Sequence, residues 1–398
     1  MIFLPTSMGR LNKRALLRRL QKAGLASRAG LAQALGMSQP TAGKIVDELL
    51  SVGVLEEIET SGSGKALRGR PGRMLRLNQS KSRLIAIQFG LQDTAVAGLS
   101  LGVTGLDEWH VTFALPNNEP NPARAWEKQL RLAAKKIGGK NFFGALLSVP
   151  GLVDEKANRI LFSPNVHWTE RADLAAIVRR VWKVPVLLVQ EQRALAVGQH
   201  LADPGCEDFL LVDFGEGVGG AVVMDGKLLA HPLPISGEIG HTPVLGNRRQ
   251  CGCGAVGCME TLISQRGLLE SFAAAQRNRK VTWADLPQYI LRNGLPAWLA
   301  RSLDAAAVSI CAALNVLGLR HVVVTGTLTE LPPAVMAHLA QAVQNGSMWA
   351  KFGSVECVAA PRRRMAGLVA IGIDRLVVPD RDKNNFSPQK FSAGRHRH

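Results

Sequence analysis

A short cysteine-rich segment restricts the folding of this chain more than any other part of its sequence. Three of the six cysteines, Cys251, Cys253 and Cys258, fall within eight residues, and His241 precedes them by ten positions. Three thiolates and one imidazole make a complete tetrahedral set of zinc ligands, and the intervening glycines permit the tight turns that gather them around one ion. We therefore expect a zinc-binding loop over 241–258. Because no coordination position stays open, the ion would be structural; the alternative is a loop of reduced cysteines without metal.

Composition excludes two broad classes of protein. Clustered cysteines in a chain of 398 residues are typical of a metal site in a reducing compartment and not of a secreted disulfide framework. No uninterrupted apolar run approaches the roughly 20 residues of a membrane helix, and the stretch 305–319 is short and contains polar residues. Residues 1–24 show no apolar block followed by a small-residue cleavage site. We expect a cytoplasmic globular protein of two or three domains with no membrane partner.

Positive charge is concentrated at the N-terminal end of the chain. The net charge is +17, and residues 1–78 alone hold 13 Lys or Arg against 5 Asp or Glu. Such clustering favours a polyanionic partner, because neutralised phosphates release their counterions. Charge alone does not identify a partner, so the pattern within this segment has to decide.

The same segment shows the pattern of a helix-turn-helix. Leucines at helical spacing predict a helix over 11–21. Ser27 is placed to cap a second helix that Gly36 ends, and Ser38 is placed to cap a third helix with Pro40 in its first turn. Two short helices joined by a tight turn, the second with a polar outer face, form the unit that enters the DNA major groove.

A basic wing follows these helices. A strand begins near Gly53, residues 61–65 form a Gly/Ser hairpin tip, and a basic arm over 68–73 returns to a strand at 74–77. Arginines of such an arm can follow the DNA backbone or enter a minor groove. We interpret residues 1–80 as a winged helix-turn-helix domain; the alternative is a three-helix interaction domain with a solvated basic face. The residues that we expect at the DNA are Ser38, Gln39, Thr41, Gly43, Lys44, Arg68, Arg70 and Arg73.

Two later segments resemble each other. Residues 84–90 and 209–215 are apolar strands that run into a glycine turn, and a second strand follows each, at 94–101 and 220–223. This repeat predicts an α/β protein with two lobes, of the actin-like and sugar-kinase-like (ribonuclease H-like) type. In that type the paired turns hold nucleotide phosphates through backbone N–H groups.

The C-terminal part of the sequence fits the same fold. An apolar strand is predicted over 321–325, ending at Gly326, and a closing helix over 365–378. Residues 379–398 are polar and basic without periodicity, so we expect a disordered basic tail.

Together these motifs resemble the ROK family, which is named for its repressors, open reading frames and kinases. Besides the helix-turn-helix and the cysteine cluster, the resemblance covers 148–151, 164–168, the glycine turn at 215–220, and the motif that ends at His241. A winged helix ahead of a ROK domain, which we place at 81–378, implies a sugar-responsive transcriptional regulator of the xylose, N-acetylglucosamine or glucose repressor type. The implied partners are a double-stranded DNA operator, a sugar or sugar derivative, and further copies of the chain in a homodimer or higher homo-oligomer. The implied targets are genes of carbohydrate metabolism.

The resemblance also implies a sugar site. In the family, the Glu and His of a Glu-x-Gly-His motif and a Glu two positions beyond the last cysteine bind sugar hydroxyls; here these are Glu238, His241 and Glu260. Carboxylates accept hydrogen bonds from adjacent hydroxyls, and a metal-held imidazole is fixed in orientation. The other interpretation makes Glu238 and Glu260 acids near the metal. The full set of expected sugar-binding residues is Gly151, Asn165, Gln190, Glu191, Glu238, His241 and Glu260.

The sequence departs from the family's kinases at the reacting groups. Gln190 and Glu191 stand where the kinases have an Asn-Asp pair whose Asp is the general base, and Glu is one methylene longer. A displacement near 1 Å costs about 100-fold in a positioned reaction. Arg193 replaces a further Asn, and we expect it either to pair with Glu191 or to meet an acidic ligand.

The nucleotide side departs further. Gln88 and Leu91 replace the Asp and the second Gly of the first phosphate loop, and Glu216 replaces a Thr in the second, where its carboxylate would repel phosphate. Phosphoryl transfer rests on positioning and charge stabilisation, so we expect no kinase activity and no catalytic residue. Two alternatives stay open: an ATP-dependent sugar kinase with an added DNA-binding domain, and a regulator controlled by a protein partner.

Overall fold

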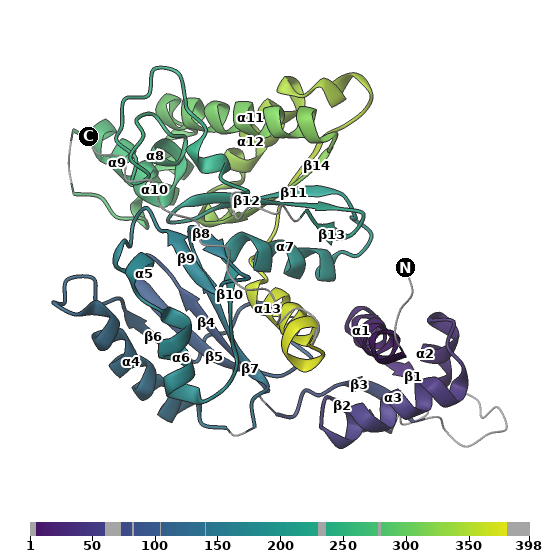
Figure 1. Cartoon of the computed structure of the whole chain (residues 1–398). Coiled ribbons are helices and arrows are strands. Elements are labelled where there is room, and N and C mark those ends of the chain that lie inside the picture. Colours follow the sequence, from purple (N-terminus) through teal and green to yellow (C-terminus); the bar gives the residue numbers. More distant parts are fainter. Residues whose placement is uncertain are drawn as a thin grey trace, which may run out of the picture.

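The computed structural model describes residues 5–59, 73–81, 83–103, 105–139, 141–229, 236–277 and 280–379. Figure 1 shows a small N-terminal domain beside two larger α/β parts. We call residues 83–202 together with 364–378 lobe 1, and residues 209–359 lobe 2, because each contains one five-stranded sheet. The two-lobed α/β fold predicted from the sequence is confirmed.

The N-terminal domain is a winged helix-turn-helix. Its elements are the helices α1 (Pro5–Ala23), α2 (Arg28–Ala34) and α3 (Gln39–Ser51) and the strands β1 (Ala26–Ser27), β2 (Leu55–Ile58) and β3 (Met74–Leu77). The strands form an antiparallel sheet in the order β1-β3-β2. Both predicted caps are present, because the Ser27 hydroxyl accepts the Gly30 N–H and the Ser38 hydroxyl accepts the Thr41 N–H. The first helix extends beyond the predicted 11–21 at both ends.

Lobe 1 is built around a sheet in the order β10-β7-β4-β5-β6. Its strands are β4 (Leu84–Phe89), β5 (Asp93–Leu99), β6 (Val111–Ala114), β7 (Gly144–Val149) and β10 (Val186–Gln190), with a side hairpin of β8 (Leu152–Asp154) and β9 (Arg159–Phe162). Its helices are α4 (Pro122–Ile137), α5 (Trp168–Arg171), α6 (Leu174–Trp182) and α7 (Glu191–Ala202). Trp126 of α4 is fully buried and donates its indole N–H to the Thr94 hydroxyl at 2.9 Å, which satisfies two buried polar atoms at once.

Lobe 2 repeats this plan in the order β13-β12-β11-β14-β15. Its strands are β11 (Phe209–Phe214), β12 (Val218–Met224), β13 (Lys227–Leu228), β14 (His321–Gly326) and β15 (Glu356–Ala359). Its helices are α8 (Glu260–Ile263), α9 (Gln265–Ala275), α10 (Asp285–Asn293), α11 (Ala297–Leu317) and α12 (Pro333–Gly346), with short 3-10 turns at Ile239–His241, Thr327–Glu330 and Met348–Lys351.

The repeat seen in the sequence is therefore a repeat of the whole sheet. The first strand of each lobe, β4 or β11, is antiparallel to the next strand in the chain and parallel to the fourth, β7 or β14. Both glycine turns stand at corresponding ends of corresponding strands. They consequently face the same space between the lobes.

The C-terminal helix returns to lobe 1 and crosses α7 at very close range. This helix, α13 (Arg364–Gly372), continues into a π-helical turn at Ile373–Val377, which confirms the predicted closing helix. A Cβ atom at Gly367 would lie 1.8 Å from the Ala194 carbonyl oxygen, and one at Gly198 would lie 2.0 Å from the Arg363 carbonyl oxygen. Only glycine allows the two backbones to approach this closely.

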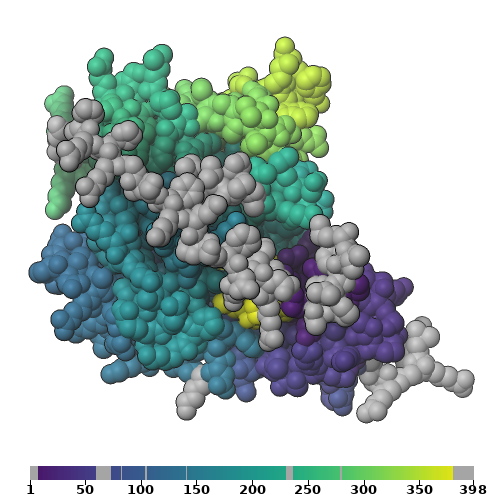
Figure 2. Space-filling view, in the orientation of Figure 1, coloured from purple at the N-terminus to yellow at the C-terminus, as the bar shows by residue number. Residues whose placement is uncertain are grey.

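The N-terminal domain is docked on this C-terminal segment. Leu16, Leu17 and Leu20 of α1 belong to one buried cluster that also contains Leu368 and Ile373. Figure 2 shows the C-terminal segment (yellow) between lobe 1 and the N-terminal domain (purple). The DNA-binding fold and the two-lobed fold thus share a core.

One helix of lobe 2 is long and apolar enough to cross a membrane by length and composition, namely α11. The sequence prediction considered only uninterrupted apolar runs, and Arg301 and Asp304 interrupt this one. Leu303, Ile310 and Leu314 of α11 are fully buried in the core of lobe 2. The helix thus packs as a core helix.

Candidate functional site

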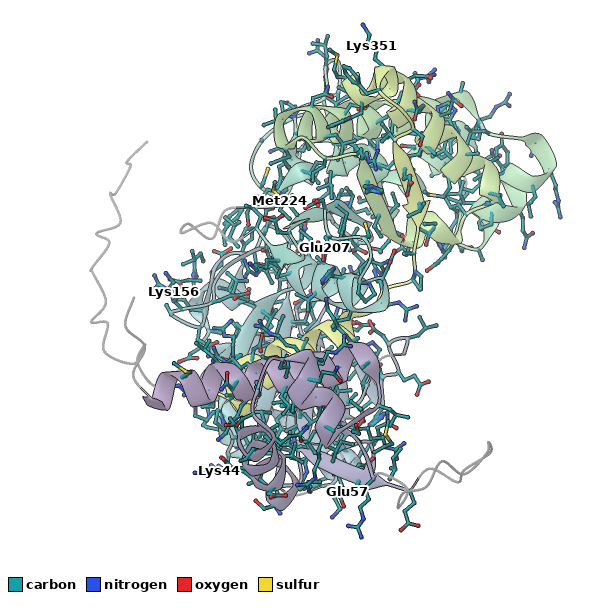
Figure 3. All side chains as sticks on the ribbon, turned by 90° about the vertical axis from the view of Figure 1, so that its right-hand side faces the viewer. Lys44, Glu57, Lys156, Glu207, Met224 and Lys351 are labelled. Atoms are coloured by element: carbon teal, nitrogen blue, oxygen red, sulfur yellow. The ribbon has the colours of Figure 1, made fainter. Side chains whose placement is uncertain are left out.

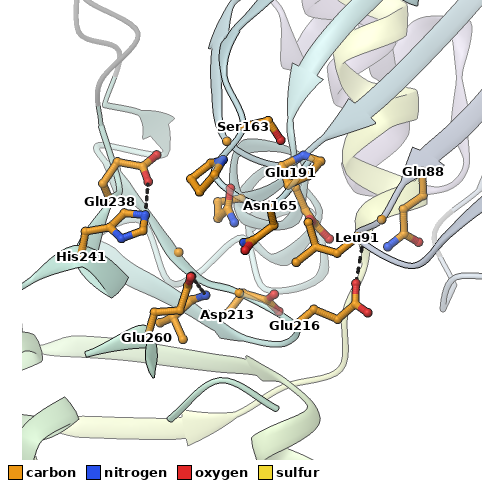
Figure 4. Close-up of a pocket in the computed structure, with 18 of the residues that line it drawn as sticks. Gln88, Leu91, Ser163, Asn165, Glu191, Asp213, Glu216, Glu238, His241 and Glu260 are labelled. Carbon is orange, nitrogen blue, oxygen red and sulfur yellow. Dashed lines mark hydrogen bonds and ion pairs between the residues drawn. The ribbon is translucent and has the colours of Figure 1, made fainter. Parts of the chain in front are cut away.

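A cavity of about 110 Å³ lies between the lobes. Both lobes contribute to its wall, and the two glycine turns form one end of it (Figure 4). The lining residues used below are Gln88, Leu91, Gly151, Asn165, Glu191, Asp213, Glu216, Glu238, His241, Glu260 and Arg362.

Six of the seven predicted sugar-binding residues line this cavity. Gly151, Asn165 and Glu191 come from lobe 1, and the other three come from lobe 2. The seventh, Gln190, is buried behind them, and its side-chain amide donates to a Glu238 carboxylate oxygen at 3.3 Å and to the Ser236 carbonyl oxygen at 3.5 Å. The structure brings the set together, and its contact with sugar stays a prediction.

Glycines hold the Glu-x-Gly-His loop against β12. A Cβ atom at Gly237 would lie 1.9 Å from the Gly220 carbonyl oxygen, and one at Gly240 would lie 2.2 Å from the Val218 carbonyl oxygen. The loop therefore lies flat on the strand, and the 3-10 turn that follows directs His241 toward both the cavity and the cysteines. Gly151 has a similar role in lobe 1, because its φ is +82° and a Cβ would lie 2.4 Å from the Phe162 carbonyl oxygen.

The two glutamates of this wall have different partners. Glu260 begins α8, and its carboxylate accepts the Val218 N–H at 2.8 Å, which fixes the start of β12. Glu238 lies 3.6 Å from the His241 Nε2 atom. Burial raises the pKa of Glu238, and nearby Glu260 adds to this, although His241 opposes it. The structural role of Glu260 toward β12 was not visible in the sequence.

His241 and the three cysteines form a compact cluster of potential metal ligands. All four ligand atoms lie within 4.8 Å of one another, with His241 Nδ1 at 3.6 Å from Cys251 Sγ and Cys253 Sγ at 3.6 Å from Cys258 Sγ. Burial and the neighbouring thiols raise the pKa of Cys258 to about 12. Without a cation the Cys258 thiol stays protonated, and a central dication would reverse this. The donor set and its spacing fit one tetrahedral ion.

The two glycine turns are joined across the cavity by a carboxylate. Glu216 of the β11–β12 turn accepts the Leu91 N–H of the β4–β5 turn at 2.9 Å, as Figure 4 shows. Burial raises the pKa of Glu216, and Asp93 and Glu191 add to this, while the Leu91 hydrogen bond opposes it. Sequence reasoning identified Glu216 as repulsive to phosphate but did not find its partner in the other lobe.

Two arginines connect the turns to the C-terminal helix: Arg362 lies between β15 and α13, and Arg364 is the first residue of α13. Arg362 donates two hydrogen bonds of 2.8 Å to Asp213. Burial opposes ionisation of Asp213, but Arg362 outweighs it and lowers the pKa of Asp213. Arg364, almost completely buried, donates to Gln88 at 3.0 Å and pairs with Glu191.

These pairs show that one of the two expectations for Arg193, an ion pair with Glu191, is wrong. Its guanidinium does not pair with Glu191, because Arg364 takes that carboxylate, and it lies instead 3.1 Å from Glu155. Arg364 lies 173 residues from Glu191 in the chain, so no local pattern could have indicated the true partner.

The predicted DNA-contacting side of α3 is exposed. Ser38, Gln39, Thr41 and Lys44 are exposed and Gly43 is partly exposed. Lys44 lies at the end of the molecule opposite Lys351 of lobe 2 (Figure 3). Arg73 is also exposed, and it pairs with Glu57 at 2.8 Å. The other two predicted wing residues, Arg68 and Arg70, lie outside the described residues, and so does the expected tail beyond residue 379.

The fold and the cavity define a class: a sugar-kinase-like protein of two lobes that carries a winged helix-turn-helix. Comparison with known protein families matches residues 85–372 to the ROK family. The chain belongs to the ROK family.

Individual relatives agree with this assignment. The xylose repressor of Caldicellulosiruptor bescii is 24% identical over 291 residues, which cover 71% of this chain and 72% of the relative. The DNA-binding transcriptional dual regulator NagC of Escherichia coli K12 is 24% identical over 265 residues, which cover 65% of this chain and 63% of NagC. A solved ROK family transcriptional regulator, a homologue of the Escherichia coli Mlc protein, has a TM-score of 0.71 at 17% identity and covers 93% of this chain and 98% of its own. At this identity the structural likeness shows the fold.

Proposed function

We propose that this protein is a sequence-specific DNA-binding repressor of carbohydrate genes whose ROK domain responds to a sugar or sugar derivative. One observation carries the proposal: a winged helix-turn-helix is docked on the same C-terminal segment that reaches the inter-lobe cavity. The relatives named as repressors and regulators support it. They also support a cytoplasmic location and operator DNA as the partner.

The cavity favours binding over phosphoryl transfer. Six of the seven predicted sugar-binding residues face the cavity, whereas the Glu216 carboxylate accepts the Leu91 N–H of the first glycine turn. Glu191, at the position of a kinase's base, is held by Arg364. A carboxylate that is held in an ion pair and carries one methylene more than Asp is poorly positioned to act as a general base. We therefore assign the cavity to ligand sensing and no enzymatic activity to the chain.

We assign a structural zinc ion to His241, Cys251, Cys253 and Cys258. With four protein ligands the ion would have no open position, so it would activate no water. Its contribution here would be to fix the His241 ring, with Nδ1 on the metal side and Nε2 toward Glu238 and the cavity.

The segment 362–378 supports a route from the cavity to the DNA-binding domain. At one end, Arg362 and Arg364 hold residues at the two glycine turns. At the other, Asp374 accepts from Arg18 of α1 at 3.1 Å. A ligand shifts the equilibrium between two lobe angles only if it binds one of them more tightly. A sugar that does so would move this segment and, with it, α1. In a two-fold homodimer the spacing of the two recognition helices would then change.

The test is binding of the purified protein to DNA from upstream of its own gene, at fixed salt, with and without a panel of sugars. We expect specific binding that one sugar alters. Lys44→Ala should weaken it and reduce its salt dependence, whereas Lys156→Ala, which removes an exposed lysine of lobe 1, should not. Binding no better than to random DNA would overturn the regulator assignment. Specific binding that no sugar changes would favour control by a protein partner.

The coupling route has its own matched pair of variants. Arg18 and Arg19 are adjacent exposed arginines of α1. Among the described contacts, Arg18 pairs with Asp374 and Arg19 does not. Arg18→Ala should reduce the effect of sugar on DNA binding, while Arg19→Ala removes the same charge and should leave the effect unchanged. Equal responses of both variants would show that this ion pair carries no coupling.

A further inference from the structure

The cavity between the lobes is lined by carboxylates far more than by cations. Among the described residues, five acidic side chains face it, and Arg362 is the only arginine or lysine in its lining. The acidic residues are Glu191, Asp213, Glu216, Glu238 and Glu260. His241 is a further titratable group among the described lining residues, and its Nδ1 faces the cysteine cluster.

Arginines neutralise only two of these acids. Arg362 pairs with Asp213 and Arg364 pairs with Glu191. Glu216, Glu238 and Glu260 form no ion pair with an arginine or lysine among the described residues, although the charge of Arg362 acts on Glu216 from a longer distance. These three therefore leave the cavity with an uncompensated negative potential. Carboxylates in a partly dry cavity repel an anion more strongly than in water, since the effective dielectric constant is lower.

The same acids occupy the backbone donors that would otherwise bind an anion. The Leu91 N–H of the first glycine turn donates to Glu216, and the Val218 N–H of the second donates to Glu260. The Gly215 N–H donates to the Gly217 carbonyl oxygen within its own turn. Phosphate and carboxylate ligands depend on free N–H groups of this kind. At these three positions the chain supplies its own acceptors.

We infer that the cavity binds an uncharged or cationic carbohydrate, such as a neutral sugar or an amino sugar with a free amine, and excludes phosphorylated sugars and nucleotides. This inference rests on the proposed sugar-sensing function and narrows its ligand class. Hydroxyl and ammonium groups donate hydrogen bonds to the unpaired carboxylates. A phosphate would face three acids, while Arg362 is paired with Asp213 and the Leu91, Val218 and Gly215 N–H groups are already bonded.

Isothermal titration calorimetry with matched ligands tests the inference. The probes are xylose, glucose, mannose and galactose, with the 2-amino and the 6-phosphate forms of the three hexoses. We expect a neutral or amino form to bind at least 10-fold more tightly than the phosphate of the same skeleton. A sugar phosphate that binds more tightly than its parent sugar overturns this inference but leaves the proposed sugar-sensing function standing. Failure of every form to bind overturns the sugar-sensing function itself.

Two variants assign the selectivity to charge. Glu216→Gln keeps an oxygen that can accept the Leu91 N–H but removes the negative charge, and it should raise phosphate affinity relative to the parent sugar by roughly 10-fold. Glu119→Gln makes the same change at an exposed position outside the cavity and should leave the ratio unchanged. An unchanged ratio in Glu216→Gln, with folding verified by circular dichroism, would contradict the role given to Glu216.

Discussion

The first strands of the two lobes offer a direct comparison, because they occupy the same place in two sheets of the same order. Gln88 of β4 and Asp213 of β11 both precede a Phe-Gly turn, and each lies beside a hydroxyl residue of the neighbouring parallel strand, Ser148 or Thr325. Each also receives an arginine from the same short segment of chain. Arg364 reaches Gln88, and Arg362 reaches Asp213.

The difference lies in where the negative charge is kept. In lobe 2 the strand itself supplies the acid that balances its arginine. In lobe 1 the strand supplies a neutral amide, and Glu191 and Asp107 balance Arg364 from outside it. Duplicated backbones therefore keep their geometry while their side chains diverge, and the charge at each turn has to be established in three dimensions.

The largest expected effect concerns a feature that lobe 2 alone possesses, the cysteine cluster. Under the proposed zinc assignment, Cys258→Ser should reduce bound zinc from about one ion per chain to none, because a tetrahedral site loses one of its four ligands. On the order of 10 kcal/mol of metal-binding free energy would be lost with it. Metal analysis and chemical denaturation measure both quantities. Cys206→Ser, outside the cluster, is the control and should retain the ion.

A smaller effect is expected from the equivalent strand positions themselves. Asp213 is buried and ionised, so Asp213→Ala leaves the partly buried Arg362 without its partner and should cost about 3–5 kcal/mol of unfolding free energy. Gln88→Ala removes a neutral partner while Arg364 keeps two acids, and should cost about 1 kcal/mol. Urea denaturation at one pH compares the two variants. Equal losses would show that the two positions are equivalent in energy as well as in geometry.

Two glycines should respond to substitution in opposite ways: Gly367 lies at the crowded crossing of α7 and α13, and Gly43 lies on the exposed helix α3. Gly367→Ala forces α13 away from α7 and should destabilise the protein by about 1–3 kcal/mol. A Cβ atom added at Gly43 would meet no heavy atom within 4 Å, so Gly43→Ala should stabilise α3 by up to about 1 kcal/mol. If Gly43 allows DNA to approach closely, the same variant binds operator DNA more weakly. Thermal unfolding and a DNA-binding titration give the two readouts.

The smallest expected effect is a pH dependence of the free energy of unfolding that comes from Glu216 in the β11–β12 turn. Its pKa is raised in the folded protein, so the folded state binds the proton more tightly than the unfolded state. This contribution to stability is fully present below the unfolded pKa and is lost as pH rises through the folded pKa. Glu216→Gln removes the titration. The stability of this variant relative to the unaltered protein should therefore increase from acidic to neutral pH, and a constant difference would contradict the assignment.

Short-range patterns in the sequence were enough to predict most of the local structure and the clustering of His241 with three cysteines. Ser27 and Ser38 cap the first turns of their helices, and Gly36 follows the end of α2. The repeat of β4 and β11 is visible as two apolar segments a few residues long. The cysteines lie so close together in the chain that a single loop gathers them. Interactions of such short range need no knowledge of the rest of the fold.

The pairing of charged groups, in contrast, depends on the tertiary structure. Glu216 bonds Leu91 across 125 residues, Arg362 holds Asp213 across 149, and Arg18 reaches Asp374 across 356. An acidic or basic side chain is compatible with many partners, and its own sequence neighbours do not select one. The choice is made when the two lobes face each other and the C-terminal helix returns to lobe 1, because burial then leaves each charge with the few partners within its reach.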